Sequence, residues 1–294
     1  MHIGQRIKEL RVSKMMTQSD LAGDQITRNM LSSIEHGTAL PSLPTAMYIA
    51  ERLNVPVGYL LSRGEDEFIY RKMAAISNIR HAFAARDFSG CLALLSSFGN
   101  ESDDELALLR AECEYGMGLE AFESGRLRFA MSAWDRALLA SEQTVFDTSW
   151  LRERIAVIFR YLTALSTTLV SDVLDAEEIE RAHAVGDGLV EYVMTREDLE
   201  QGHTDRAREY IERYPNSPYG ERLAALLLMR EGNYPAAQEA LEKLLAKDEL
   251  TFGLLLYEVF GDLETCYRKN DDYKRAYEFS GSRIGLLERL LEEI

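Results

Sequence analysis

Four polar side chains, Arg28, Asn29, Ser32 and Ser33, recur at positions that share one face of a short helix. A guanidinium group donates hydrogen bonds, whereas amide and hydroxyl groups both donate and accept them. Residues three and four apart are neighbours on a helix surface. This stretch therefore predicts a helix that presents hydrogen-bonding groups to a partner along one side.

Two short helices joined by a tight turn are predicted to position this face, within Thr17–Gly37. Thr17 and Thr27 offer N-cap hydroxyls, and Leu31 and Ile34 give the second helix an apolar side opposite the polar one. The stretch ends in a glycine, the residue that most easily takes a positive φ at a helix end. A helix-turn-helix that exposes such a face reads DNA in the major groove, so double-stranded DNA is the predicted partner.

Further amphipathic segments predict helices on both sides of this pair. Apolar residues at i, i+4 and i+7 from Ile3 predict an opening helix. Ser42 is the predicted cap of a helix that runs through Leu53, with Met47, Ala50 and Leu53 facing inward. A last short turn closes a compact five-helix unit.

The charge of the chain is divided unevenly along its 294 residues. Residues 1–64 hold seven Lys/Arg and five Asp/Glu, a balance of +2, whereas residues 65–294 hold 26 and 44, a balance of −18. The acidic part would repel phosphate groups. Any contact with DNA is therefore expected from the first 64 residues alone, which indicates two domains with two tasks.

Several segments of the first part resemble, in order, the XRE-type helix-turn-helix fold of phage repressors. These are IGQRIKELR, TQSDLA, ITRNMLSSIEHG, PS and AERLNVPVGYLL. The resemblance covers nearly all of residues 3–62 and implies a five-helix, lambda-repressor-like domain over residues 1–64. There is one departure: Leu21–Thr27 is one residue shorter than the usual L-A-x-x-x-G-V-S and lacks its turn glycine. A similarly short turn occurs in Rgg-like regulators.

The resemblance also implies roles for individual residues. Arg28 would pair with O6 and N7 of guanine, and Asn29 with N6 and N7 of adenine. Gln18 would touch a phosphate or brace the recognition helix, and Arg11 would form an internal ion pair with Glu35. The full predicted DNA-binding set is Gln18, Thr27, Arg28, Asn29, Ser32, Ser33, His36 and Thr38, of which His36 and Thr38 would lie near the DNA backbone. The alternative is a domain whose polar face is merely solvated and no longer binds DNA.

From Phe68 onward the sequence reads as consecutive helical hairpins. The segment GLEAFESGRLRFAMSAWDRAL resembles the tetratricopeptide repeat, in which small residues let two helices approach and an aromatic side chain fills the gap. Related units are RDFSGCLALL, QGHTDRAREYI, EGNYPAAQEAL and NDDYKRAYEF. Their small residues, at positions 91, 130, 207, 237 and 276, lie 39, 77, 30 and 39 residues apart, and the gap of 77 leaves room for one more unit. The expected fold class is therefore all-α, with a tetratricopeptide-like α-solenoid over residues 65–294.

The repeat pattern implies a concave surface lined by the first helix of each hairpin. Aromatic side chains and arginines on that surface would suit an extended peptide, because apolar pockets take its side chains and guanidinium groups its carboxylates. The predicted peptide-binding residues are Arg80, Phe83, Tyr115, Phe122, Tyr219, Arg222, Met229, Arg230, Arg268 and Lys269. The competing interpretation is that methionine and aromatic residues at helical spacing belong to the core.

The last segment places Ile284, Leu287, Leu291 and Ile294 on one helical stripe. The stripe would cap the array or pair with its twin in a coiled-coil contact. A homodimer is expected in either case, because one recognition helix touches too few bases for useful specificity.

Signs of catalytic or cofactor chemistry are missing from the sequence. The five histidines and three cysteines have no metal-binding spacing, and the motifs of phosphate-binding loops, serine hydrolases and zinc proteases are absent. No enzyme activity, cofactor or metal is therefore expected. The sequence contains no apolar run long enough for a membrane span and no signal peptide at its start, so a cytoplasmic protein that does not bind membranes is expected.

An XRE-type domain followed directly by tetratricopeptide-like repeats resembles the Rgg, PlcR and PrgX group of bacterial regulators, the RRNPP type. That resemblance implies a dimeric transcription regulator of the quorum-sensing kind, whose DNA binding is controlled by a short signalling peptide in the repeat groove. Asn78 is the only asparagine well inside a groove helix, which leaves an arginine-based grip on the peptide rather than an asparagine clamp. Two alternatives stay open: a DNA-tethered scaffold that binds a protein partner, and a repressor whose repeats serve only dimerisation.

Overall fold

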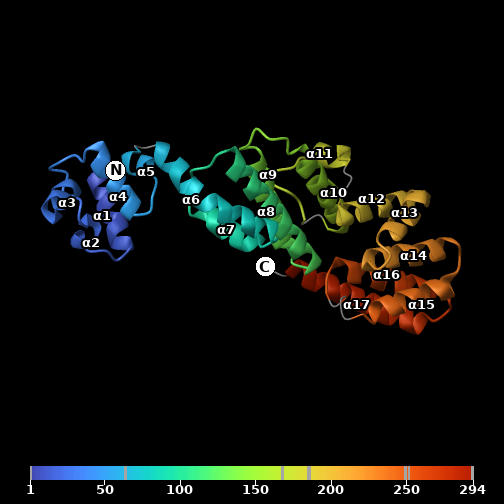
Figure 1. Ribbon diagram of the computed structural model, residues 1–294. Coiled ribbons are helices and arrows are strands. Elements are labelled where there is room, and N and C mark those ends of the chain that lie inside the picture. The colour runs from blue at the N-terminus through green and yellow to red at the C-terminus, as the bar shows by residue number, and fades with distance from the viewer. Residues whose placement is uncertain are drawn as a thin grey trace. The chain divides into compact units, whose positions relative to one another are not determined.

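The computed structural model describes residues 2–62, 65–166, 169–183, 187–247, 250 and 252–292. Within these residues all seventeen regular elements are α-helices, which confirms the all-α fold class. The chain divides into two compact units, residues 1–81 with 98–101 and residues 82–97 with 102–294. Because α6 (Glu65–Ala84) spans this division (Figure 1), a functional domain boundary after residue 64 stays a prediction.

Five short helices, most of α6 and the segment 98–101 make up the first unit. Side chains of His2, Thr17, Thr27 and Ser42 accept hydrogen bonds from backbone N–H groups and so cap the first four helices. At Thr17 the cap is reciprocal, since the Asp20 carboxylate accepts from the Thr17 backbone. The five helices are α1 (Ile3–Ser13), α2 (Gln18–Ala22), α3 (Arg28–Glu35), α4 (Leu43–Arg52) and α5 (Val57–Leu61).

The core of the first unit contains one or more apolar side chains from each of the five helices. Its fully buried members include Ile7, Leu21, Leu31, Ile34, Ile49, Leu53 and Leu60. The inward position predicted for Met47 is wrong, because this side chain is 54% exposed. The buried stripe of α4 runs through Ala46, Ile49 and Ala50 instead, and Met47 lies on the opposite side of the helix.

Gly4 allows α1 to pack directly against the end of α3. A Cβ atom at this position would lie 1.9 Å from the backbone carbonyl oxygen of Ile34. Backbone cannot retreat as a flexible side chain can, so only glycine permits this approach. The contact fixes α3 to the rest of the unit.

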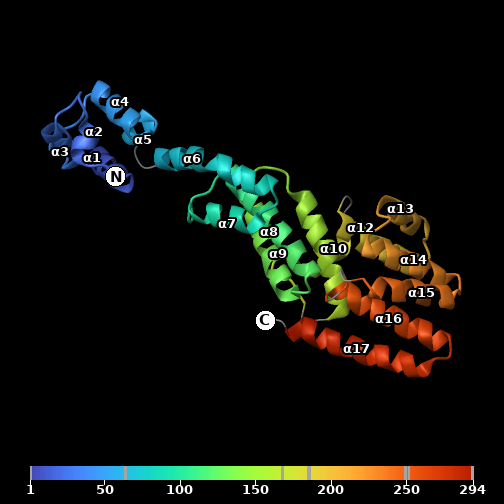
Figure 2. The same cartoon turned by 60° about the horizontal axis from the view of Figure 1, so that its bottom comes forward.

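The second unit is a stack of helical hairpins (Figures 1 and 2). Consecutive helices pair in α8–α9, α12–α13, α14–α15 and α16–α17, and α10 packs on the short α11 in the interval where one more unit was expected. The helices are α7 (Phe88–Ser96), α8 (Asp104–Glu123), α9 (Leu127–Ser141), α10 (Ser149–Leu165), α11 (Ala176–Arg181), α12 (Gly188–Gln201), α13 (Asp205–Arg213), α14 (Pro218–Arg230), α15 (Tyr234–Leu245), α16 (Leu254–Lys269) and α17 (Tyr273–Glu292).

The α8–α9 hairpin has the small-residue and aromatic packing that its sequence predicts. Trp134 of α9 is fully buried and covers Gly118 of α8, where a Cβ would lie 2.1 Å from the indole nitrogen. That nitrogen donates a hydrogen bond to the carbonyl oxygen of Tyr115, 3.3 Å away. The small residues that set the repeat period are all buried: Cys91, Ala130, Ala207, Ala237 and Ala276.

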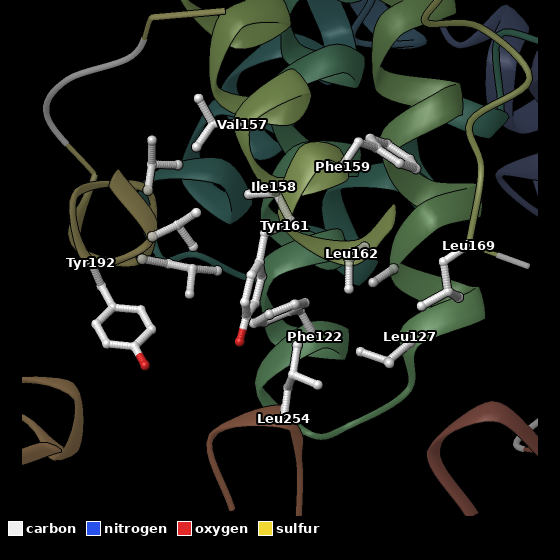
Figure 3. Packing of buried hydrophobic residues seen from close by; sticks show 14 of the residues in the cluster. Phe122, Leu127, Val157, Ile158, Phe159, Tyr161, Leu162, Leu169, Tyr192 and Leu254 are labelled. Atoms are coloured by element: carbon white, nitrogen blue, oxygen red, sulfur yellow. The ribbon is translucent and has the colours of Figure 1, made fainter. Parts of the chain in front are cut away.

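One continuous core runs through the stack. Figure 3 shows Phe122 of α8 and Leu127 of α9 beside Phe159, Tyr161 and Leu162 of α10, with Leu254 of α16 close below. Residues more than a hundred positions apart in the sequence therefore share this core.

Helix α17 returns to the α8–α9 turn. At Gly125, in that turn, a Cβ would lie 2.5 Å from the ring of Phe252 and 3.0 Å from a methyl group of Leu290. The fully buried residues of α17 are Leu286 and Leu290. The predicted stripe is therefore wrong in register.

Of that stripe, Leu287 and Leu291 are half-buried and Ile284 is 58% exposed. Ile294 lies outside the described residues. The predicted stripe follows helical spacing from Ile284, whereas Leu286 and Leu290 are the residues of α17 that face the core. No helix of the described part of the chain is long and apolar enough to cross a membrane.

Candidate functional site

The polar face of α3 carries side chains that are not used inside the protein. Arg28 and Asn29 occupy the first turn of the helix and are exposed. Neither side chain makes a hydrogen bond with the described residues. Thr27, just before them, is also exposed but its hydroxyl accepts the backbone N–H of Met30. Arg28 and Asn29 are thus the exposed members of the predicted set whose side chains make no hydrogen bond with the described residues.

The other predicted residues of α3 and the following turn are partly engaged. Nδ1 of His36 lies 2.7 Å from the carbonyl oxygen of Ser32, and the Thr38 hydroxyl donates to the carbonyl oxygen of Ser33 at 3.0 Å. Ser32 and Ser33 are half-buried, whereas His36 and Thr38 are exposed. These contacts fix the C-terminal end of α3 and the turn at Gly37, where φ is +73°.

A buried carboxylate, Glu35, ties α3 to α1 and α2. Glu35 accepts two hydrogen bonds from Arg11, at 2.7 and 3.0 Å, and one from Nε2 of Gln18 at 2.8 Å. The ion pair predicted for Arg11 and Glu35 is therefore present. Burial alone would raise the pKa of Glu35, but the hydrogen bonds from Arg11 and Gln18 and the charge of Arg11 hold that pKa below its usual value. Of its two predicted roles, Gln18 performs the bracing one here.

The shortened turn between α2 and α3 is held by α4. Gly23 ends α2 with φ +52°, and a Cβ there would lie 2.3 Å from the Tyr48 hydroxyl. That hydroxyl donates to the carbonyl oxygen of Ala22 at 3.0 Å, and Arg52 donates to the carbonyl oxygen of Asp20. A glycine therefore does stand in the turn, but at its start, and α4 sets the angle between the two helices.

Positive charge around this face comes from few residues. Arg6 is buried and donates to the Tyr59 and Ser62 carbonyl oxygens, so it is structural in the same way as Arg11. Exposed cations in the described part of the domain that donate no hydrogen bond are Lys8, Lys14 and Arg28. Lys8 and Lys14 were not among the residues predicted from the sequence, although Lys8 lies on the polar side of α1 and Lys14 directly follows that helix.

A pocket in the second unit collects residues from the first helices of three hairpins. It brings three of the predicted peptide-binding residues together, Arg222, Met229 and Arg230, all on α14. Its full lining is Arg196, Leu199 and Glu200 of α12, Arg222, Leu226, Met229 and Arg230 of α14, Tyr234 of α15, and Asp262 and Thr265 of α16. The combination of apolar side chains with arginines is the one expected for a peptide groove.

Arg222 lines this pocket, and its Nε and Nη1 atoms bind internal partners. Its Nε donates to Asp262 at 2.7 Å and its Nη1 donates to Glu258 at 2.8 Å. Nη1 also contacts the Tyr192 hydroxyl, which donates to Glu258 at 2.6 Å. Burial raises the pKa of Asp262, and the charge of Arg222 opposes that shift. Arg222 therefore holds α12, α14 and α16 together.

Arg196 on α12 extends the same network. It was not among the peptide-binding residues predicted from the sequence. Its Nη1 donates to Glu258 at 2.9 Å, its Nε and Nη2 both donate to Glu200, and its guanidinium carbon lies 4.8 Å from the ring centre of Tyr161. The four-residue spacing of Arg196 and Glu200, like that of Glu258 and Asp262, places each pair on one helix face. That spacing was the available signal.

Arg230, which lines the pocket, and Lys269, which lies near the lining residue Tyr234, have no carboxylate partner among the described residues. Arg230 donates only to the carbonyl oxygen of Glu200 at 3.0 Å, and Lys269 lies 5.9 Å from the ring centre of Tyr234. The third predicted cation of this region, Arg268, pairs with Glu264 one turn earlier in α16.

The remaining predicted groove residues lie elsewhere in the unit or in its core. Phe122 is buried against Trp134, and Tyr115 is buried with its hydroxyl donating to Asp187 at 3.0 Å. Tyr219 packs on Tyr192 with ring centres 4.5 Å apart. Phe83 packs on Phe88, and Arg80 is exposed on α6. These five do not line the pocket, and for Phe122 and Tyr115 packing is the role that the structure supports.

The described residues offer little for metal chemistry. No group of three or more His, Cys, Asp or Glu side chains among them is placed to hold a metal ion. Cys91, Cys113 and Cys266 are buried and form no disulfide. Burial raises the pKa of Cys266 to about 12, so this thiol is a poor nucleophile near neutral pH.

Comparison with known proteins gives a family match within the first unit. Residues 7–60 match the helix-turn-helix family, and no curated protein matches the chain. Similar solved structures include PlcR of Bacillus thuringiensis in complex with the peptide PapR7 and DNA, at 15% identity over 99% of each chain and a TM-score of 0.26. ComR of Streptococcus vestibularis with its signalling peptide XIP is 17% identical over 95% of this chain and 96% of that one, with a TM-score of 0.26. The pheromone receptor Rgg2 of Streptococcus dysgalactiae is 14% identical over 82% and 99%, with a TM-score of 0.24.

Proposed function

We propose that this protein is a sequence-specific, DNA-binding transcription regulator that acts as a homodimer in the cytoplasm and has no enzymatic activity. The observation that carries the proposal is the helix-turn-helix match over residues 7–60 together with the uncommitted Arg28 and Asn29 at the start of α3. Glu35, held by Arg11 and Gln18, fixes that helix from the opposite side. The geometry therefore presents rigid, unpaired donors and acceptors of the kind that read base edges.

The DNA-binding proposal is tested on the two exposed side chains. Asn29→Ala is expected to relax sequence preference at one base pair of each half-site, and Arg28→Ala at another, with only a small change in the salt dependence of binding. Arg28→Lys keeps the charge but not the planar fork, so it should resemble Arg28→Ala if the residue reads a base and the wild type if it contacts a phosphate.

The measurement is selection of binding sites from random DNA with purified protein. Gln5→Ala, the loss of an exposed amide on α1, is the matched control. If both α3 variants select the same sites with the same affinity as the wild type, α3 is not the recognition helix.

We further propose that a short peptide bound in the pocket of α12, α14 and α16 controls this activity. Apolar walls from Leu226 and Met229 stand beside Arg230, a cation with no carboxylate partner among the described residues. Such a site takes a bulky side chain and a nearby carboxylate from the same ligand. Arg222 contributes by holding the three helices in place rather than by meeting the ligand.

Thermal unfolding of the full chain with pools of short synthetic peptides tests this second part. A ligand that binds only the folded state raises the melting temperature, and the stabilisation grows with the logarithm of the ligand concentration relative to Kd. The rise should be lost in Arg230→Ala and kept in Arg268→Ala, whose guanidinium is already paired with Glu264. No stabilisation by any pool, with a protein partner recovered instead, would favour the scaffold alternative.

A further inference from the structure

A second pocket of the repeat unit lies between the two helices of one hairpin, α12 and α13 (Figure 1). It shares no residue with the pocket on α12, α14 and α16. On α12 its residues recur three and four positions from Glu191, so they lie on a different face of the helix from Arg196 and Glu200. The lining is Glu191, Met194 and Thr195 of α12 and Arg206, Glu209, Tyr210 and Arg213 of α13. The two pockets are therefore separate sites.

Two ion pairs between the helices lie at the ends of this pocket. Nη1 of Arg213 donates to both carboxylate oxygens of Glu191, at 2.8 and 3.0 Å. Nη1 of Arg206 donates to Asp198 at 2.6 Å. Both arginines therefore already have a carboxylate partner. The two pairs also fix the register of the hairpin, in which the helices run antiparallel and each step forward on α12 matches a step back on α13.

Thr195 presents a buried hydroxyl group to the pocket. The residue is 4% exposed, and its hydroxyl makes no hydrogen bond with the described residues. A threonine inside a helix can donate to the carbonyl oxygen one turn earlier, as Thr163 and Thr265 do. Thr195 does not. A buried polar group without a partner lowers stability, so this hydroxyl is a group that a ligand in the pocket satisfies.

Glu209 supplies the uncompensated charge of the site. It stands opposite Thr195 in the register of the hairpin. Its carboxylate is exposed and makes no hydrogen bond or ion pair with the described residues. Because Arg206 and Arg213 are paired with carboxylates of α12, Glu209 leaves the site with a negative charge in excess. The site therefore favours a cation over an anion.

The remaining walls suit a short carbon chain. The side chain of Met194 stands opposite the ring of Tyr210, whose hydroxyl is already used because it donates to the carbonyl oxygen of Gly188 at 2.9 Å. An aromatic ring also attracts a cation beside it. The cavity measures about 130 Å³. An apolar cavity of roughly 150 Å³ holds one benzene molecule, so this one admits a ligand group of similar size.

We propose that the pocket between α12 and α13 binds the ammonium end of a short aliphatic amine. Glu209 and Thr195 accept hydrogen bonds from the nitrogen, which has three donors and no acceptor, and Met194 and Tyr210 enclose the carbon chain. Free alkylamines and the lysine side chains of another molecule both carry this group. The proposal goes beyond the proposed function and does not rest on the binding of DNA or of a peptide.

Titration of the full chain with three ligands tests the charge preference of the site. n-Butylamine, n-butanol and butyrate have carbon chains of one length and differ in the head group. The methyl resonance of Met194, identified with Met194→Leu, reports binding in this pocket. n-Butylamine should shift that resonance with a Kd at least about tenfold lower than that of n-butanol, since hydrogen bonds to charged groups are the stronger ones. Butyrate that binds as tightly as n-butylamine, or no shift with n-butylamine, overturns the proposal.

Two variants test the residues that hold the nitrogen. Glu209→Gln should raise the Kd of n-butylamine about tenfold or more, because it keeps the size of the side chain and removes its charge. Thr195→Val should raise that Kd about fivefold without lowering the melting temperature, since the hydroxyl has no hydrogen bond within the described residues to lose. Glu212→Gln, which removes an exposed carboxylate of α13 outside the pocket, is the matched control. An affinity unchanged by Glu209→Gln contradicts the proposal.

Nα-acetyl-lysine amide distinguishes the two sources of the amine. If it shifts the Met194 resonance with a Kd close to that of n-butylamine, the pocket admits a lysine side chain of another molecule. If it leaves the resonance unchanged while n-butylamine shifts it, the site is one for free amines. A protein that selects DNA sites but binds no amine would contradict this proposal alone. One that binds n-butylamine but selects no DNA site would contradict the proposed function alone.

Discussion

The face of α3 and the pocket on α12, α14 and α16 use the same kinds of side chain for opposite purposes. Arg28 and Asn29 on α3 have no partner among the described residues, whereas Arg222 in the pocket binds Glu258 and Asp262. The internal hydrogen bonds and ion pairs of an arginine in a candidate binding site therefore determine how many of its donors a ligand can use. By that standard Arg28 and Asn29 are available to a ligand on the α3 face, whereas in the pocket the available arginine is Arg230.

Among variants that test this contrast between the two sites, Arg222→Ala should have the largest effect, which is on the free energy of unfolding. Removal of one partner from a buried ion pair typically costs about 3–5 kcal/mol of unfolding free energy, since the other charge stays buried alone. Arg222→Ala leaves two carboxylates, Glu258 and Asp262, without their main cation. We expect a fall of that size in urea unfolding of the second unit, while the first unit keeps its own stability.

Arg230→Ala is the matched control for that experiment. A result in which Arg222→Ala unfolds no more easily than Arg230→Ala would mean that Arg222 is not structural, and it would return Arg222 to the predicted peptide-binding set.

A smaller effect is expected at Glu35, the internal brace of the α3 face. Glu35→Gln should lower the free energy of unfolding by about 2 kcal/mol at neutral pH, in the range for hydrogen bonds to charged groups. Because the folded pKa is lowered, the carboxylate stabilises the domain fully above its unfolded pKa of about 4.3 and loses that effect as pH falls through the folded value.

The difference between wild type and Glu35→Gln should therefore shrink below about pH 4. Unfolding curves at a series of pH values measure it. A free-energy difference that stays constant down to pH 2 would show that Glu35 does not stabilise the domain through its negative charge.

On the α3 face itself, the expected loss appears in binding rather than in stability. Asn29→Ala should cost about 1–3 kcal/mol of discrimination at one base pair, with the melting temperature unchanged because the side chain is exposed and makes no hydrogen bond with the described residues. Competition between the selected site and single-base variants of it measures this cost. Equal loss for every variant site would indicate a phosphate contact instead.

The smallest effect is expected at Arg230 of the pocket. Arg230→Ala removes one hydrogen bond to the carbonyl oxygen of Glu200, and exposed substitutions of this kind usually change stability by less than about 0.5 kcal/mol. Thermal unfolding without ligand should therefore match the wild type. A large loss of stability would mean that Arg230, like Arg222, stabilises the fold and is not kept available for a ligand.

The features predicted well from the sequence are local ones. Thr17 and Thr27 cap the two helices because a cap depends on residues two or three positions away. The pairing of Gly118 with Trp134 follows from the spacing inside one hairpin. The fold class and the exposed face of α3 could thus be predicted without a structure.

The features predicted poorly depend on partners far away in the chain. Arg222 looked available because Glu258 and Asp262 come from another hairpin, about 40 residues later. Phe122 looked like a groove residue, but it lies in the core with residues of α10 and with Leu254 of α16. On α17 the periodicity allowed two overlapping stripes, and only contact with α16 and with the α8–α9 turn selects Leu286 and Leu290.

The return of α17 to Gly125 also changes how the repeat unit should come apart. In an open array each repeat touches only its neighbours, so the ends fray first and unfolding spreads inward. Here Leu290 and Phe252 both pack at the turn between α8 and α9. Helix α17 is therefore held at both of its neighbours, α16 and this turn, and is not a loose end. We expect amide protons of α17 to exchange almost as slowly as those of α9, in a single cooperative opening rather than in steps.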